Sequence, residues 1–179
     1  MIITISGTPG SGKSTMAKKL VERYKLEYYS MGRVMRDIAK KRGIDFLKLT
    51  EIAKKDASVD KEIDKYQKDL GKKDNILVDS RIGFFFIPNS IKIFLKVDEK
   101  EAAKRIMKYE REDEKYKDEK EAVKAIKKRM NAEKERYKKY YGINNFRDKK
   151  NYDFVLDTTN LSIEEVFERI LRFIDNRLQ

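Results

Sequence analysis

The chain has 179 residues, a length that suits one domain with a sizeable hydrophobic core. It contains neither Cys nor His, which excludes disulfides, thiolate or imidazole metal sites and the commonest general base. The 43 Lys and Arg residues outnumber the 31 Asp and Glu residues by 12, so the surface either attracts anions such as nucleotides and nucleic acids or is the solvated, Lys- and Glu-rich surface of a thermophilic protein.

The N-terminal segment carries a phosphate-binding motif. Residues 2–5 are a β-branched run that predicts a buried strand, and residues 7–14 then fit the pattern G-x-x-x-x-G-K-[ST] at every fixed position. In this pattern the glycines let backbone N–H groups approach phosphate, the lysine reaches the β- and γ-phosphates, and the hydroxyl can ligate Mg²⁺. An amphipathic helix follows, as the chemistry requires. The ATP-binding candidates are Gly7, Thr8, Pro9, Gly10, Ser11, Gly12, Lys13, Ser14 and Thr15.

Four further strands are predicted, at residues 26–29, 76–79, 91–97 and 152–157; the partial alternation of 91–97 favours a place nearer an edge. Helical stretches separate most of them, which indicates a mainly parallel sheet. We therefore predict an α/β protein with a three-layer, P-loop NTPase-type fold around a five-stranded, mainly parallel sheet. Ligands bind such sheets beyond the carboxyl ends of the strands. Polar residues near these ends are Ser14, Ser30, Asp79 and Asp157.

We expect a single domain, 1–179, with two helical insertions. Residues 31–72 are helical and charged, and Gly43 separates two helices within them. Residues 108–150 are rich in Lys and Glu and have a thin apolar stripe, so this arm is predicted to pack weakly and to move as a lid; an exposed arm or a coiled-coil contact is the alternative. The sheet core is expected to comprise 1–30, 73–107 and 151–179.

Asp79 ends an apolar strand, where a P-loop protein places its metal-supporting acid, so Ser14 and Asp79 are the magnesium candidates. The alternative is an acid that caps a turn. Phosphoryl transfer between two nucleotides also needs arginines that neutralise the phosphates. Arg36 and Arg81 closely follow strand ends and are the best candidates. The wider set is Arg33, Arg36, Arg81, Arg105, Arg111, Arg129 and Arg136.

Several segments resemble those of the nucleoside monophosphate kinases and, within them, the archaeal-type cytidylate kinases. Beside the P-loop, residues 30–36 resemble S-x-G-x-x-x-R, and residues 60–67 resemble D-x-x-[IL]-D-x-x-Q. Residues 79–81 match [DE]-[GS]-R, and residues 133–143 are similar to the lid ending S-E-x-x-R-Y-x-x-Y-G-I. Residues 152–158 match the closing strand of that group, so the resemblance runs over nearly the whole chain.

The resemblance implies ATP-dependent, Mg²⁺-assisted phosphorylation of CMP or dCMP. Arg36 and Arg81 would bind the acceptor phosphate, and Arg129 and Arg136 would be lid arginines that close over the phosphates; with Lys13 these form the expected catalytic set. The residues expected near the pyrimidine are Asp60, Asp64 and Gln67; an exposed helix face is the alternative for them. The aromatic segment 82–88 and the residues after Arg129 depart from the pattern of the group.

Other functions remain open at the level of sequence. The acceptor could be AMP, UMP or a small metabolite. A P-loop module that binds nucleic acid through the basic arm is a rival, although the arm is dense in Glu as well as in Lys. A nucleotide-gated interaction protein is a third reading. The chain shows no membrane-length apolar run and no signal segment, so we expect a cytoplasmic monomer without membrane or nucleic-acid partners.

Overall fold

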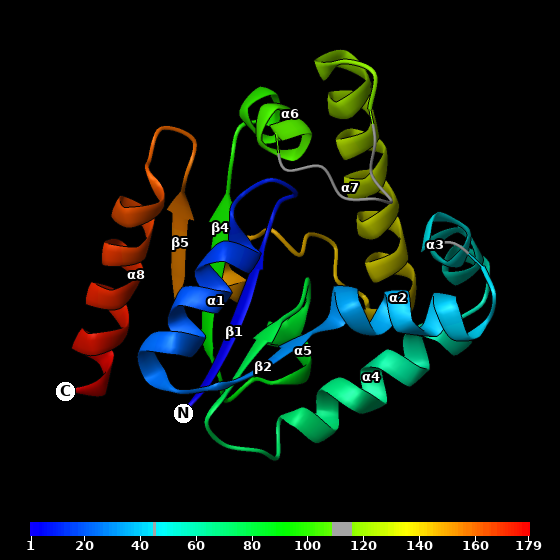
Figure 1. Cartoon of the computed structure of the whole chain (residues 1–179). Helices are drawn as coiled ribbons and strands as arrows, with labels where there is room; N and C mark the ends of the chain where they lie inside the picture. Colours follow the sequence, from blue (N-terminus) through cyan, green and yellow to red (C-terminus); the bar gives the residue numbers. More distant parts are fainter. Residues whose placement is uncertain (45, 109–115) are drawn as a thin grey trace.

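In the computed structural model, which describes residues 1–44, 46–108 and 116–179, five strands form one sheet. They lie in the order β2-β3-β1-β4-β5, and all four pairings are parallel (Figure 1). The predicted α/β fold with a five-stranded parallel sheet is therefore confirmed. The strands are β1 (Ile2–Gly7), β2 (Glu27–Ser30), β3 (Ile76–Asp79), β4 (Ile91–Lys96) and β5 (Phe154–Asp157).

The fourth strand lies nearer an edge than the central strand β1, as predicted, although it is not itself an edge strand. β4 pairs with β1 on one side and with β5 on the other, and the edges are β2 and β5. The lysines that produced its partial alternation, Lys92 and Lys96, form ion pairs with Asp153 (3.8 Å), directly before β5, and with Asp157 (3.0 Å), at the end of β5. Charge on an interior strand is accommodated because the neighbouring strand supplies acids at matching positions.

Helices cover both faces of the sheet (Figure 1). On one face α1 (Lys13–Tyr24) and α8 (Ile163–Leu178) pack against side chains such as Ile3 and Ile5 of β1. The other face is covered by residues of the insertion helices and of the C-terminal end of α7, among them Ile38, Ile63 and Tyr137. No described helix is long and apolar enough to cross a membrane. Further helices are α2 (Met31–Lys41), α3 (Phe46–Lys55), α4 (Ser58–Leu70), α5 (Gly83–Phe86), α6 (Glu99–Lys108), α7 (Glu119–Tyr141) and a 3-10 helix at Lys149–Asn151.

The central strand β1 is buried along its whole length because both faces of the sheet are covered. Its polar residues therefore need internal partners. The hydroxyls of Thr4 and Ser90 are 2.9 Å apart, and Ser6 Oγ donates to the main-chain oxygen of Arg81 at 2.8 Å. Ser6 thus fixes the chain directly after β3, where the segment Asp79–Arg81 leaves the sheet.

The long helix α7 is held at both ends. Near its start, the buried side chains Ala122 and Ile126 pack with Ala102 and Ala103 of α6. Near its end, Tyr137 is buried in the core cluster on the sheet. The central turns of α7 therefore run between these two anchors. Part of the predicted lid region, including Arg111, lies outside the described residues.

Candidate active site

The phosphate-binding loop turns sharply between β1 and α1. Gly10 has φ +74°, and a Cβ there would lie 2.8 Å from backbone atoms of Ala102 in α6. Gly12, the N-cap of α1, has φ +84°. Both positions therefore require glycine. Gly12 is a fixed glycine of the motif, whereas Gly10 stands at one of its variable positions. The loop ends at the N-terminus of α1, where unpaired N–H groups and the helix dipole favour an anion.

A cavity of about 960 Å³ lies over the carboxyl ends of the strands and reaches from this loop to α4 and α7. It brings together the residues predicted from separate segments of the sequence. Those that line it are Pro9, Gly10, Ser11, Gly12, Lys13, Ser14, Thr15, Arg36, Asp60, Asp64, Gln67, Asp79, Arg81, Arg129 and Arg136.

Two of the predicted nucleotide-binding residues, Gly7 and Thr8, make hydrogen bonds that hold the loop in place. The main-chain oxygen of Gly7 accepts a hydrogen bond from Arg81 Nη1. Thr8 Oγ1 accepts a bond from the Val97 N–H at 3.2 Å, which fastens the loop to the end of β4. The contacts of Gly7 and Thr8 therefore shape the loop and place Arg81 beside it.

Ser14 and Asp79 lie together at the end of the sheet. Ser14 Oγ donates to Asp79 Oδ2 at 3.4 Å, and the Tyr28 hydroxyl donates to the same oxygen at 3.3 Å. They meet because β1 and β3 are neighbours, with Ile5 opposite Asp79. A hydroxyl and a carboxylate are hard oxygen donors, and Mg²⁺ is commonly bound by one or two carboxylates plus substrate phosphates. The pair fits such an ion, and the described residues contain no cluster of three or more acidic ligands.

Glu133 joins two arginines beside the loop. Its carboxylate accepts from Arg81 Nε at 3.1 and 3.2 Å and from Arg129 Nε at 3.3 Å. Burial opposes its charge, but Arg81 and Arg129 more than offset this and lower the pKa of Glu133. Sequence analysis assigned no role to Glu133, although its i, i+4 spacing from Arg129 and its place in the segment similar to the lid ending were available signals. Glu133 therefore positions Arg81 and Arg129 as a pair.

Lys13 lies among cations. Burial and the charge of Arg81 lower the pKa of Lys13 to about 7, and Asp79 opposes the shift. Desolvation and neighbouring positive charge thus both disfavour the charged form of Lys13. Phosphate oxygens would restore the balance, so the electrostatics favour a polyanionic ligand at the loop.

The opposite wall of the cavity is one face of α4. Asp60, Asp64 and Gln67 share this face because their spacing follows the helical repeat. Both oxygens of Asp64 accept from the Tyr141 hydroxyl at 2.9 Å, and burial raises the pKa of Asp64 to about 6. Gln67 Oε1 accepts from Ser80 Oγ at 2.5 Å. Two of the three predicted base-side residues, Asp64 and Gln67, therefore already accept hydrogen bonds from protein hydroxyls.

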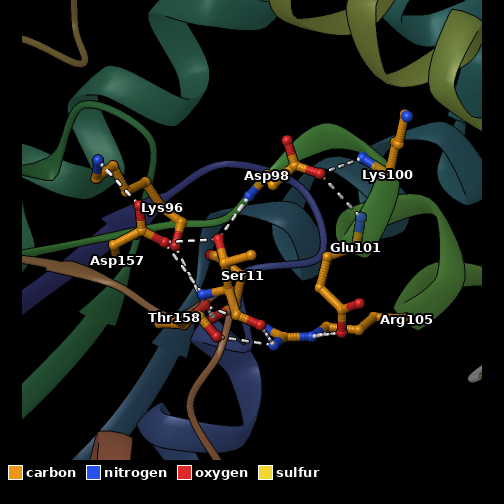
Figure 2. Close-up of polar contacts among 9 residues, drawn as sticks. Ser11, Lys96, Asp98, Lys100, Glu101, Arg105, Asp157 and Thr158 are labelled. Atoms are coloured by element: carbon orange, nitrogen blue, oxygen red, sulfur yellow. Dashed lines mark hydrogen bonds and ion pairs between the residues drawn. The ribbon is translucent and has the colours of Figure 1, made fainter.

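A rigid polar network lies on the other side of the loop (Figure 2). Arg105 of α6 donates through Nε to Glu101 (2.9 Å), through Nη1 to Thr158 Oγ1 (3.1 Å), and through Nη2 to the main-chain oxygens of Thr158 (2.8 Å) and Thr159 (3.1 Å). Thr158 Oγ1 in turn donates to the main-chain oxygen of Ser11 (3.3 Å). Thr158 thus ties Arg105 to the phosphate-binding loop, a role that the sequence analysis missed.

Comparison with known proteins agrees with this geometry. A family model described as the cytidylate kinase-like family matches residues 2–160. The chain belongs to the cytidylate kinase-like family. The family predicted from the motifs is thereby confirmed.

Relatives of this cytidylate kinase-like chain match it over nearly its whole length. It is 35% identical over 181 residues to a cytidylate kinase of Methanocaldococcus jannaschii, with 98% of each chain covered. It is 37% identical over 171 residues to an S-adenosylmethionine-dependent nucleotide dehydratase of Lacinutrix mariniflava, of which it spans only 35%. Among solved structures, a shikimate kinase from Bacteroides thetaiotaomicron shares the fold, with a TM-score of 0.67, 12% identity and 98% of each chain covered.

Proposed function

We propose that this chain transfers the γ-phosphoryl group of ATP to CMP or dCMP, giving ADP and the cytidine diphosphate. The observation that carries the proposal is that one cavity is lined by the phosphate-binding loop, by arginines such as Arg36 and Arg81, and by the polar face of α4. Cytidylate kinases related over nearly the full length of the chain support cytidine as the nucleoside.

The donor nucleotide is assigned to the loop side. The backbone from Gly10 to Ser14 and the ammonium of Lys13 hold its phosphates. The guanidinium of Arg105 is fixed by four hydrogen bonds beside the loop and provides a flat surface for the base of the donor. Ser14 and Asp79 would hold Mg²⁺, which, when bound, neutralises phosphate charge.

The acceptor phosphate is assigned to Arg36 and Arg81. Arg81 is fixed by Glu133 and by the main-chain oxygen of Gly7, within the same cavity as Lys13. An oxygen of the acceptor phosphate attacks the γ-phosphorus, and the bond from that phosphorus to the oxygen of the departing ADP breaks. The attacking oxygen is already anionic, so positioning and charge neutralisation supply the catalysis and no general base is required.

The arm formed by residues 108–150 is assigned the role of a lid, and residues 31–72 that of the acceptor-binding insertion. Residues of α7, among them Arg129 and Ala132, line the cavity and would face both substrates. Exclusion of water by this arm would favour transfer over hydrolysis of ATP. We also propose that the protein acts as a monomer on small molecules in the cytoplasm.

Coupled ADP production with MgATP and CMP, dCMP, UMP, AMP or GMP tests the proposal. We expect the largest kcat/KM with CMP or dCMP. A preference for another monophosphate would keep the reaction and change the acceptor. Transfer to none of the five would contradict the proposed function.

Binding of ATP should take up a proton near neutral pH. At about pH 8, Lys13 with a pKa of about 7 is mostly neutral in the free protein, and phosphate oxygens favour its charged form, so binding takes up about one proton. At about pH 6 the residue is already charged and the uptake disappears. Calorimetric titration in buffers of different ionisation enthalpy measures this number. Lys13→Arg, whose guanidinium stays charged, is the control, and equal uptake by it would contradict the assignment.

A further inference from the structure

Two buried polar atoms on the α4 side of the cavity have no hydrogen-bond partner among the described residues: Asp60 Oδ2 and Arg136 Nε. Both residues line the cavity, and their side chains are 9% and 10% exposed. Arg136 Nε is 3.7 Å from the other carboxylate oxygen, Oδ1, which is an ion pair but too long for a hydrogen bond. One acceptor and one donor therefore stand side by side, and burial makes their lack of partners costly.

The neighbours of this pair already have partners. Asp64 accepts from the Tyr141 hydroxyl, and the Gln67 carbonyl oxygen accepts from Ser80. Arg136 itself is oriented by a bond from Nη2 to the Tyr137 hydroxyl at 3.3 Å. The surroundings thus hold Asp60 and Arg136 in place while leaving one atom of each for a ligand.

The pair lies away from the phosphate end of the site. Arg129 and Glu133 are the α7 residues whose charges act on Lys13. Arg136 is seven residues beyond Arg129, which corresponds to about 10 Å along a helix. That offset is comparable to the span of a nucleoside monophosphate from its phosphate to its base, so a phosphate beside Arg81 and Arg129 would leave the base near Asp60.

We propose that Asp60 and Arg136 read the base of the acceptor: Asp60 Oδ2 accepts from the amino group N4 of cytosine, and Arg136 Nε donates to N3. The proposal rests on the proposed function and gives Arg136 a role at the base rather than at the phosphates. Uracil presents a carbonyl in place of the amino group and an N–H in place of N3, so in the same pose both contacts become repulsive. Adenine presents the same amino and ring-nitrogen edge, so the size of the site must reject it.

Asp60→Asn and Arg136→Lys test the proposal through binding. Asparagine keeps the shape of Asp60 but adds donors, and lysine keeps the charge beside Asp60 but lacks the planar Nε, so each should lower the ratio of CMP to UMP affinity by about tenfold. Titration calorimetry gives both dissociation constants without relying on catalysis, and thermal unfolding verifies that each variant is folded. Ribose 5-phosphate, which has no base, should inhibit both variants as it inhibits the wild type.

Arg129→Lys is the matched control from the phosphate end of α7. It should weaken CMP, UMP and ribose 5-phosphate together and leave the CMP to UMP ratio unchanged. An unchanged ratio in both test variants would overturn the base-reading pair, and so would a parallel loss of ribose 5-phosphate inhibition, which would return Arg136 to the phosphates. If either of these results is found and the wild-type protein still transfers phosphate to CMP, this inference alone is refuted. If the wild-type protein transfers phosphate to no monophosphate, the proposed function is refuted.

Discussion

Lys13→Met is expected to lower kcat for transfer from ATP to CMP by about a thousandfold, because it removes a charged donor to the phosphates in which negative charge develops. Methionine has nearly the length of lysine and can occupy the same half-buried position. The stability of the free protein should not fall with the activity. Lys13 is a half-buried cation next to Arg81, and both desolvation and Arg81 lower its pKa, so a neutral side chain relieves unfavourable charge.

Steady-state kinetics and thermal unfolding of the same Lys13→Met sample test this prediction. Lys19 is a partly exposed lysine on the same helix, 3.9 Å from Glu164 and 5.1 Å from the centre of the Phe167 ring, and Lys19→Met is the matched control. The control should retain wild-type kcat. A Lys13→Met protein with kcat within about tenfold of the wild type would show that the loop does not hold the transferred phosphoryl group.

Arg81→Met is expected to impair activity and stability together. The loss of a phosphate-neutralising arginine should reduce kcat/KM by about a thousandfold. The same change removes one of the two arginines that accompany buried Glu133. Breaking a buried pair costs about 3–5 kcal/mol when the remaining charge has no other partner; because Arg129 remains, we expect a loss of about 2 kcal/mol in the free energy of unfolding.

The double variant Arg81→Met with Glu133→Gln separates the two effects. In the Arg81→Met protein the carboxylate of Glu133 has lost one of its two arginines. Replacing this carboxylate by an amide should restore part of the stability but none of the activity. Denaturant unfolding and kinetics of the wild type, both single variants and the double variant form the cycle. Additive stability losses would show that Arg81 and Glu133 are not energetically coupled, and recovery of activity in the double variant would show that Arg81 does not bind phosphate.

Local motifs made much of the site predictable. The phosphate-binding loop could be predicted from residues 7–14 because its glycines, its lysine and its hydroxyl lie within eight consecutive residues. Asp79 was predictable for a related reason: it ends an apolar strand, and the carboxyl ends of parallel strands share one edge of the sheet. Its distance of 3.4 Å to Ser14 agrees with that expectation.

Contacts between distant segments were not predictable in the same way. Strand periodicity describes burial but not neighbours, so nothing in residues 91–97 indicated that acids of the last strand would pair with Lys92 and Lys96. The role of Glu133 depends on α7 crossing beside Arg81, 52 residues earlier in the chain. Arg136 similarly gains its partner Asp60 only through the packing of α7 near α4.

The measurement that tests the central claim most directly follows the γ-phosphoryl group itself. ATP labelled at the γ-phosphorus is incubated with the protein, Mg²⁺ and CMP, and the labelled products are separated. The account predicts that the label appears in CDP, at its terminal phosphate, with little in free phosphate. Label that appears only in free phosphate, or remains in ATP while nucleotide binding is intact, would contradict it.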